Sequence, residues 1–234
     1  MYRNAGHEFQ PTIRFWVNPP SVIVGRFQDV NMEVDVDLCN DHAITIARRF
    51  TGGGTVFHDR GNLNFTILSR RGSESIESIQ KNNCEIITDS LHKMGVPTEF
   101  IPPNSIHVNG RKISGAACAL NTKYSFWHAS ILVSSNTSLL NKLLSPSRRA
   151  AESKFVRSKW HPVTTLSEHL RKPTHIESVS LQLIRSIQDL RRIELQSGNL
   201  LEPEIEMSRN LYARKYCRSA WNFKGSVEHE KNRE

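Results

Sequence analysis

The sequence predicts an α+β domain, and three observations support that class. Strand-like segments dominate residues 13–134, helical periodicity dominates the region after them, and regular β–α–β alternation is absent. The length of 234 residues and the apolar content of 38% are those of an ordinary globular chain with one large domain or two small ones. The composition therefore excludes a disordered chain and a membrane-spanning one.

The first three strands are short and rich in β-branched residues. They cover Ile13–Val17, Ser21–Gly25 and Ala43–Ala47. A stretch with five acidic residues, from Asp29 to Asp41, separates the second strand from the third. We expect this acidic stretch to form a loop.

The next two strands are predicted to form a hairpin. Thr55–His58 and Leu63–Ser69 flank four turn-forming residues, Asp59 to Asn62. Gly61 would supply the positive φ that such a turn requires, since glycine adopts it without steric cost. The two strands should then pair with each other in one sheet.

A helix, a second hairpin and a further strand follow. The helix has its apolar residues near one face and ends at Gly95 and Pro97; these apolar residues are Ile79, Cys84, Ile87, Leu91 and Met94. Within Ser105–Ser114, the pair Asn109-Gly110 lies between alternating apolar residues, which is typical of a two-residue type I′ turn. Phe126–Ser134 has the composition of a strand.

The last third of the chain is predicted to be helical. Thr174 and Glu177 have the spacing of a capping box. Apolar residues follow at helical spacing up to Gly198, namely Val179, Leu183, Ile187 and Leu190. The residues from Gly225 onward are charged and are expected to form a frayed tail.

Charge and cysteine content narrow the possible functions. The net charge is +8, and +6 of it falls in residues 145–234, which fits either nucleic-acid binding or solvated helix faces. The first twenty residues lack the apolar stretch of a secretory signal, and no window approaches the length of a membrane span. Four scattered cysteines indicate reduced thiols rather than a disulfide framework or a zinc site. We expect a soluble intracellular protein.

The most unusual stretch, Arg48–Asp59, contains three consecutive glycines between two predicted strands. Glycine loses the most conformational entropy on ordering and adds no side-chain packing. Its advantage is close approach, because N–H groups without neighbouring Cβ atoms can surround an anion, and an adjacent arginine adds a bidentate cation. The stretch is neither a P-loop nor a G-x-G-x-x-G fingerprint. Anion binding and a flexible hairpin tip are the two interpretations.

A second motif, Gly110–Ala117, begins at the predicted turn. Lys112 precedes a run of small residues, which indicates a cation at the floor of a cleft where a ligand passes close to the backbone. Lysine is a compact point charge, suited to a phosphate or to a carbonyl oxygen that gains negative charge. The alternative is a solvated lysine that protects the edge of a sheet against aggregation.

Together the two motifs resemble those of the lipoate–protein ligase family. The run RRFTGGGTVFHDRGNLN at 48–64 is similar to the family's glycine-rich loop, and NGRKISGAA at 109–117 is similar to its lysine motif. The resemblance extends over nearly the whole chain. It includes PSVIVGRFQ at 20–28, Trp127-His128, the segment Leu144–Leu170 and WNFKG at 221–225.

The resemblance implies a fold and a reaction. The fold is that of biotin and lipoyl ligases, a class II synthetase-like mixed β-sheet with helices packed on one side. Residues 1–224 would form the catalytic domain and 225–234 a disordered tail, without the small C-terminal accessory domain of typical bacterial ligases. Lipoate and ATP would give lipoyl-AMP and pyrophosphate, with Mg²⁺ carried by the ATP phosphates. A lysine of an acceptor protein would then attack the mixed anhydride.

The resemblance also implies roles for particular residues. Lys112 is the catalytic candidate, since it would bridge the lipoyl carbonyl and the phosphate. ATP and lipoyl-AMP would contact ten residues, namely Arg49, Gly53, Gly54, Thr55, Val56, Phe57, His58, Asn62, Asn104 and Lys112. Gly53, Gly115 and Ala117 would border the lipoyl pocket. Asn104-Ser105 stands where many members have Asn-Asp, so a carboxylate that could help to hold Mg²⁺ is missing.

The implied partners are proteins. Acceptors would be apo lipoyl domains of 2-oxoacid dehydrogenases or glycine-cleavage H-type proteins, and a separate subunit would replace the accessory domain. Since such acceptors tend to be acidic, we expect the basic C-terminal part, including Arg148, Arg149 and Lys154, to face one of these proteins rather than nucleic acid. The enzyme is expected in the cytoplasm, with no membrane attachment.

Two other functions stay open. A lipoyl or octanoyl transferase would take a preactivated acyl donor and need no ATP; related octanoyltransferases use a cysteine nucleophile. Cys118 follows the lysine motif, but it does not match the position of their cysteine, and a small buried thiol is its commoner role. His128 is interpreted as a core or rim residue. A catalytically silent basic binding module is the third possibility, and the intact glycine loop and Lys112 argue against it.

Overall fold

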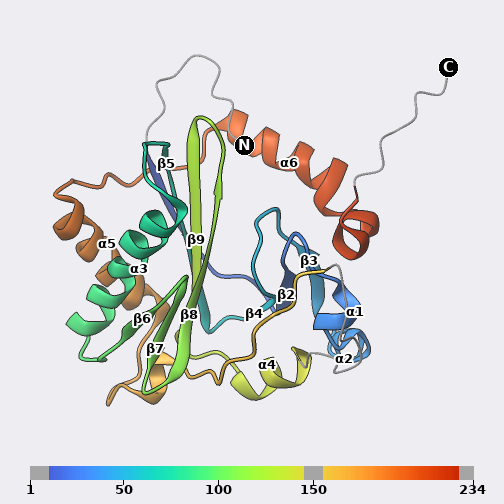
Figure 1. Cartoon of the computed structure of the whole chain (residues 1–234), viewed down its shortest axis with the longest axis horizontal. Coiled ribbons are helices and arrows are strands. Elements are labelled where there is room, and N and C mark those ends of the chain that lie inside the picture. The colour runs from blue at the N-terminus through green and yellow to red at the C-terminus, as the bar shows by residue number, and fades with distance from the viewer. Residues whose placement is uncertain (1–10, 145–154, 227–234) are drawn as a thin grey trace.

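Two β-sheets form the framework of the protein, for which a computed structural model describes residues 11–144 and 155–226 (Figure 1). The larger sheet is antiparallel throughout and has the order β1-β5-β9-β8-β7-β6. Its strands are β1 (Thr12–Trp16), β5 (Asn62–Arg70), β6 (Glu99–Ile101), β7 (Ser105–Val108), β8 (Arg111–Leu120) and β9 (Tyr124–Leu132). The smaller sheet is mixed and consists of β2 (Ser21–Val24), β3 (Thr45–Arg48) and β4 (Val56–His58), in the order β3-β2-β4.

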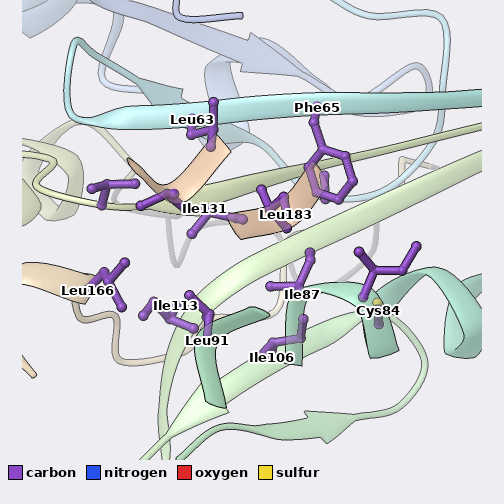
Figure 2. Packing of buried hydrophobic residues seen from close by; sticks show 14 of the residues in the cluster. Leu63, Phe65, Cys84, Ile87, Leu91, Ile106, Ile113, Ile131, Leu166 and Leu183 are labelled. Atoms are coloured by element: carbon purple, nitrogen blue, oxygen red, sulfur yellow. The ribbon is translucent and has the colours of Figure 1, made fainter. Parts of the chain in front are cut away.

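Two long helices cover one face of the larger sheet, and the smaller sheet lies on its other side (Figure 1). These helices are α3 (Ile76–Lys93) and α5 (Ile176–Arg191). Figure 2 shows the core between them and the sheet, where Phe65 and Ile131 from the strands meet Ile87 and Leu183 from the helices. Burial of this apolar surface is the main stabilising term of the large layer. The predicted α+β class, with helices on one side of the sheet, is confirmed.

Shorter elements surround the smaller sheet and close the chain. They are α1 (Val30–Glu33), α2 (Val36–Asp41), α4 (Thr137–Leu143), the 3₁₀ turn η1 (Leu166–Glu168), α6 (Glu202–Leu211) and the π-helical turns η2 (Tyr212–Tyr216) and η3 (Ala220–Lys224). A second apolar cluster joins α1, α2 and α4 to the small sheet through Val30, Cys39 and Leu140. No helix in the described ranges is long and apolar enough to cross a membrane.

Two sequence predictions hold in detail. Helix α3 begins after the capping side chain of Ser75, buries Ile79, Ile87 and Leu91, and stops where Gly95 adopts φ +87°. Between β7 and β8, Asn109 and Gly110 have φ values of 50° and 72°, as a type I′ turn requires.

The predicted hairpin of Thr55–His58 with Leu63–Ser69 is wrong. β4 pairs with β2 in the small sheet, whereas β5 pairs with β1 and β9 in the large one. The turn between them is bound to the end of β9, since the Gly61 carbonyl accepts from Val133 and Ser134. Gly61 is not in the positive-φ region. It is required for close approach, because a Cβ there would lie 2.4 Å from the carbonyl carbon of Ser134.

The expected acidic loop is also wrong, because two of its carboxylates cap helices. The side chain of Asp29 accepts from the N–H of Asn31 at the start of α1, and Asp35 accepts from Leu38 at the start of α2. Acidic residues here are thus signals for short helices rather than for irregular chain.

The predicted ends of the last long helix need correction as well. Helix α5 follows His175, without a side-chain cap, so Thr174 and Glu177 form no capping box. It ends at Arg192, which takes the left-handed conformation, and not at Gly198. Arg148, Arg149, Lys154 and the tail from 227 to 234 lie outside the described residues.

Gly61→Ala should destabilise the fold because the atoms that its Cβ would meet belong to the backbone of Ser134 and Ser135. We expect a loss of about 2–3 kcal/mol in the free energy of unfolding, measured by urea denaturation. Gly72→Ala is the matched control, since a Cβ there meets nothing within 4 Å, and its effect should stay within about 0.5 kcal/mol. Equal stability of the two variants would contradict the close approach of Gly61 to β9.

Candidate functional site

The glycine loop, Thr51–Gly54, follows β3 and is held by the guanidinium of Arg49. This group donates to the carbonyls of Gly52 (2.8 Å), Gly54 (2.7 Å) and Ile23 (3.0 Å), and to the Thr51 hydroxyl (3.1 Å). None of these acceptors is charged, and burial lowers the pKa of Arg49 to about 10. Arg49 therefore holds the loop in place by donating hydrogen bonds to its carbonyl oxygens.

Close packing explains why the loop consists of glycines. A Cβ at Gly25 would lie 2.0 Å from the carbonyl oxygen of Gly53, and a Cβ at Gly54 would lie 2.9 Å from the Ser158 hydroxyl. Gly53 itself has φ +94°. With the carbonyls bound by Arg49, the N–H groups of Gly52, Gly53 and Gly54 have no hydrogen-bond acceptor among the described residues. Hydrogen bonds thus hold the loop in one conformation and leave its N–H groups available to a ligand, so the loop is not a flexible hairpin tip.

Arg48, the neighbour of Arg49, holds the other side of the same region. It is buried, and it donates to the carbonyls of Gly25 (2.8 Å) and Gln28 (2.7 Å) in the turn beneath the loop. It also donates to the carbonyls of Trp221 (3.0 Å) and Phe223 (3.0 Å). In return, the indole of Trp221 donates to the Arg48 carbonyl at 2.8 Å. The segment 221–225 thus braces the turn that supports Gly53.

Lys112 lies on β8, between β7 and β9, so it is not on the edge of the sheet. Its side chain crosses Gly115, where a Cβ would lie 2.9 Å from Cε and 3.0 Å from Nζ of the lysine. No acceptor among the described residues bonds its ammonium, and burial lowers its pKa. Lys112 is therefore a largely buried cation whose ammonium has no bound acceptor among the described residues. The interpretation as a solvated lysine that protects the edge of a sheet is wrong.

A segment that we call the strap, residues 155–164, ties the glycine loop to Lys112. At one end the Ser158 hydroxyl accepts from the N–H of Thr55 (3.0 Å) and from the Gln28 side chain (3.0 Å). At the other end Lys112 N–H donates to Pro162 (2.7 Å) and its carbonyl accepts from Thr164 (3.0 Å). The strap thus sets how far the loop stands from the lysine.

The buried carboxylate of Glu33 anchors the middle of the strap. It accepts from the N–H of Ser158 at 3.1 Å and from the guanidinium of Arg157 at 3.2 Å. Gln28 links this anchor to the loop, since its carbonyl oxygen accepts from Gly25 N–H (3.0 Å) and from the Thr55 hydroxyl (2.9 Å). Each polar atom of this buried network has a partner, as burial demands.

A cavity lies between the two sheets, where Thr55 and β4 meet β8, β9 and the strap. Five of the residues singled out in the sequence line it, namely Thr55, Val56, Phe57, Lys112 and Gly115. Ser130, Leu132, Ser158, Lys159, Trp160 and His161 complete part of its wall. Backbone, apolar and cationic groups therefore converge on one space, which suits a ligand with an apolar part and an anionic part.

The other candidate residues surround this cavity without lining it. Gly53 stands over β8, where a Cβ would lie 4.0 Å from that of Ala117. His58 is buried and accepts from Asn18 at 2.9 Å; burial and the charge of Arg49 lower its pKa to about 3, so it is neutral at pH 7. Asn62 is buried with its Oδ1 unpartnered, and the Asn104 amide donates to the carbonyl of Ala116 at 2.7 Å.

Cys118 and His128 have structural environments. Cys118 packs against the core of the large layer, and burial raises its pKa to about 11, so the thiolate is scarce at neutral pH. His128 bonds the Thr51 hydroxyl at 2.7 Å, and burial together with Arg49 lowers its pKa to about 3. His128 thus joins the large sheet to the glycine loop, as a rim residue would.

Sequence reasoning missed the side chains that position the loop. Gln28, Glu33, Ser158 and His161 are single polar residues without a spacing pattern, and Ser158 lies 103 positions from its partner Thr55. The one available signal was Gln28, which ends the quoted PSVIVGRFQ segment. No group of three or more His, Cys, Asp or Glu side chains in the described ranges could hold a metal ion.

Comparison with known proteins gives a single family. Residues 1–188 match the model of the lipoyl protein ligase A/B catalytic domain. The chain is 31% identical over 233 residues to lipoate-protein ligase A subunit 1 of Thermoplasma acidophilum, covering 95% of this chain and 88% of that one. It is 30% identical over 220 residues to lipoate–protein ligase 1 of Staphylococcus aureus, covering 94% of this chain but only 66% of that protein.

Solved structures agree with this match. A bi-partite lipoate protein ligase from Thermoplasma acidophilum, studied with its E2 lipoyl domain, superposes with a TM-score of 0.85 at 28% identity, covering 98% and 90% of the two chains. A putative lipoate protein ligase from the same organism with bound lipoic acid gives 0.83 at 29% identity and 95% and 90% coverage. A lipoate-protein ligase A bound with ATP gives 0.81 at 29% identity, with 92% and 86% covered.

The burial of Cys118 predicts low reactivity toward iodoacetamide at pH 7.5, because its pKa of about 11 leaves almost no thiolate. Exposed Cys217 is the internal reference in the same molecule. Mass spectrometry of peptides after brief labelling should find the alkyl group on Cys217 and not on Cys118. Labelling of Cys118 first would indicate an activated nucleophile at that position.

Proposed function

The chain belongs to the lipoyl protein ligase A/B catalytic-domain family, and we propose that it is the catalytic subunit of a lipoate–protein ligase. The single observation that carries this proposal is the cavity that Thr55, Val56 and Phe57, directly after the glycine loop, line together with Lys112. It would join lipoate to ATP as lipoyl-AMP and then pass the lipoyl group to a lysine of an acceptor protein.

The first step needs positive charge where phosphate charge develops. Lys112 supplies an ammonium whose pKa is lowered by burial but which has no carboxylate partner among the described residues, so its charge is available to a ligand. The free N–H groups of Gly52–Gly54 add dipoles without side-chain bulk. Lys112 and these donors would stabilise the pentavalent phosphate and orient the carboxylate that attacks it.

The second step needs a polarised carbonyl in a water-poor space. Lys112 would bridge the acyl carbonyl and the phosphate, since both oxygens of the mixed anhydride carry partial negative charge. Thr55, Val56 and Phe57 would border the nucleotide, and Gly53, Gly115 and Ala117 the lipoyl chain. The guanidinium of Arg49 binds carbonyl oxygens of the loop. We therefore propose that Arg49 contributes to nucleotide binding indirectly, by holding the loop in place.

His58, Asn62 and Asn104 have a smaller place in this proposal. His58 is neutral and already paired with Asn18, and Asn104 is bonded to β8. Asn62 is the one of the three with an unpartnered buried oxygen, Oδ1. We propose that these residues support the walls of the ATP site rather than contact its phosphates.

Cofactor and partners follow the same reasoning. Mg²⁺ would enter with ATP, bound to its phosphates. The similar Thermoplasma acidophilum enzyme is bi-partite and was studied with an E2 lipoyl domain. We propose a separate accessory subunit and acceptors among lipoyl domains of 2-oxoacid dehydrogenases and H-type proteins, in the cytoplasm. The catalytic unit would lie within residues 1–224.

The direct test incubates the purified chain with lipoate, Mg-ATP and an apo lipoyl domain, with and without an accessory protein, and weighs the acceptor. A mass increase of one lipoyl group that requires ATP supports a ligase. Modification by preformed lipoyl-AMP, but not by lipoate with ATP, would place activation in another polypeptide. Modification from an octanoyl carrier protein without ATP would instead support the transferase.

Lys112→Ala should lower ligase activity by a factor of about 100–1,000, the usual cost of removing a group that stabilises transition-state charge. Lys123→Ala is the matched control, because this exposed lysine lies in the turn between β8 and β9, and its activity should equal that of the wild type. Cys118→Ala should retain most activity. A severe effect of Cys118→Ala with a mild effect of Lys112→Ala would overturn the ligase proposal in favour of a thioester mechanism.

A further inference from the structure

Two histidines near Lys112, His107 and His161, take no part in the adenylation and transfer steps proposed for this site. His161 belongs to the strap and lines the cavity together with Lys112. His107 belongs to β7 and pairs with Lys112 in the register of the sheet. The two imidazole rings meet edge to face, with centroids 5.5 Å apart and planes at 83°.

The transfer step leaves a proton without an acceptor. A lysine of the acceptor protein is an ammonium in solution at pH 7, and its nitrogen must lose protons before and during amide formation. Lys112 is a cation and cannot accept them. Glu33, the carboxylate that lines the cavity, is already bonded to Ser158 and Arg157. The chemistry therefore calls for a neutral base near the acyl carbonyl.

We infer that His161 is the proton acceptor for the incoming lysine, and that His107 positions its ring. This inference rests on the proposed ligase function. The lysine nitrogen attacks the acyl carbonyl carbon with its lone pair, and a C–N bond forms. The C–O bond to the phosphate breaks, and AMP leaves with the electron pair. Before this attack, one proton of the lysine ammonium passes to the imidazole of His161 and from there to water, which frees the lone pair; the second proton leaves the nitrogen for water as the amide forms.

The strap places His161 at a suitable point. Lys159 and Trp160, directly before it, line the cavity and are exposed to solvent, Trp160 to 68%. Pro162, directly after it, accepts the hydrogen bond of Lys112 N–H at 2.7 Å. In the chain, His161 thus stands between two solvent-exposed residues of the cavity wall, past which an acceptor lysine can enter, and a residue bonded to the backbone of Lys112.

His107 is buried in a defined position against the ring of His161. Its side chain is 6% exposed, and its Nε2 is buried without a hydrogen-bond partner in the described structure. An unpartnered buried nitrogen is costly and is expected where a ligand or a moving proton completes the network. Its edge-on contact fixes the plane of the His161 ring.

The electrostatic surroundings favour the neutral form of both rings, which a base requires. Burial, followed by the charges of Lys112, His107 and Lys159, lowers the pKa of His161. Burial and Lys112 lower the pKa of His107, against the opposing effects of a hydrogen bond with Gly110 and the charge of Glu99. The same cations would disfavour a protonated lysine at this point and so promote its deprotonation.

The test separates transfer from activation. Lipoyl transfer from preformed lipoyl-AMP to an apo lipoyl domain is followed in single turnovers for the wild type, His161→Gln and the control His175→Gln, an exposed histidine before α5. We expect His161→Gln to slow transfer by a factor of about 100. Pyrophosphate release with lipoate and ATP, in the absence of acceptor, should be unchanged, and His175→Gln should match the wild type in both assays.

Two further measurements distinguish a base from a structural residue. Hydroxylamine is already neutral at pH 7, so it should cleave bound lipoyl-AMP at the same rate in wild type and His161→Gln. The wild-type transfer rate should also fall as acidification protonates His161, below its ordinary pKa of 6.5, and this component should be missing in the variant. Equal transfer rates, or an equal loss with hydroxylamine, would overturn the inference. Failure of wild-type pyrophosphate release, with the accessory protein present as well as without it, would instead refute the ligase function itself.

Discussion

Two adjacent arginines at the end of β3 determine how the site is built, because each is bonded to backbone carbonyls rather than to carboxylates. Arg49 takes the carbonyls of Gly52 and Gly54, and Arg48 takes those of the turn at Gly25–Gln28 and of the closing segment at Trp221 and Phe223. Binding the carbonyl side of a glycine backbone leaves the N–H side for a ligand. A carboxylate partner would have cancelled the positive charge that an anion needs.

The charge of the site follows from this arrangement and from burial. Arg49 and Lys112 remain cationic with lowered pKa values, while His58 and His128 are held neutral by burial and by Arg49. Hydrogen bonds through Gln28, Ser158 and Glu33 then fix the distance between the loop on the small sheet and the lysine on the large one. Electrostatic preorganisation of this kind stabilises developing charge without reorganisation during the reaction. The fold serves mainly to bring two local motifs from different sheets to one cavity.

The sequence predicted the parts of this site that are local. Three glycines in a row, and a lysine before Gly115, carry their chemistry within a few residues, and the Asn109-Gly110 turn fixed the strand that presents Lys112. The strap could not be predicted, since its contacts join isolated polar residues more than a hundred positions apart. The hairpin between β4 and β5 failed for a related reason. A turn motif predicts a reversal of the chain. The Gly61 carbonyl, however, accepts hydrogen bonds from the N–H groups of Val133 and Ser134, and no local sequence pattern predicts these distant contacts or the pairing of the two strands in separate sheets.

The central claim is that the glycine N–H groups are the ligand-facing donors of the loop. Selective ¹⁵N-glycine labelling of the 12 glycines, with a non-hydrolysable analogue of lipoyl-AMP added stepwise, measures it directly by amide NMR shifts. The resonances of Gly53 and Gly54 should move on binding, while those of Gly72, Gly95 and Gly198, which have open surroundings, stay in place. Binding seen by calorimetry, with the loop resonances unchanged, would contradict the claim and place the anion elsewhere.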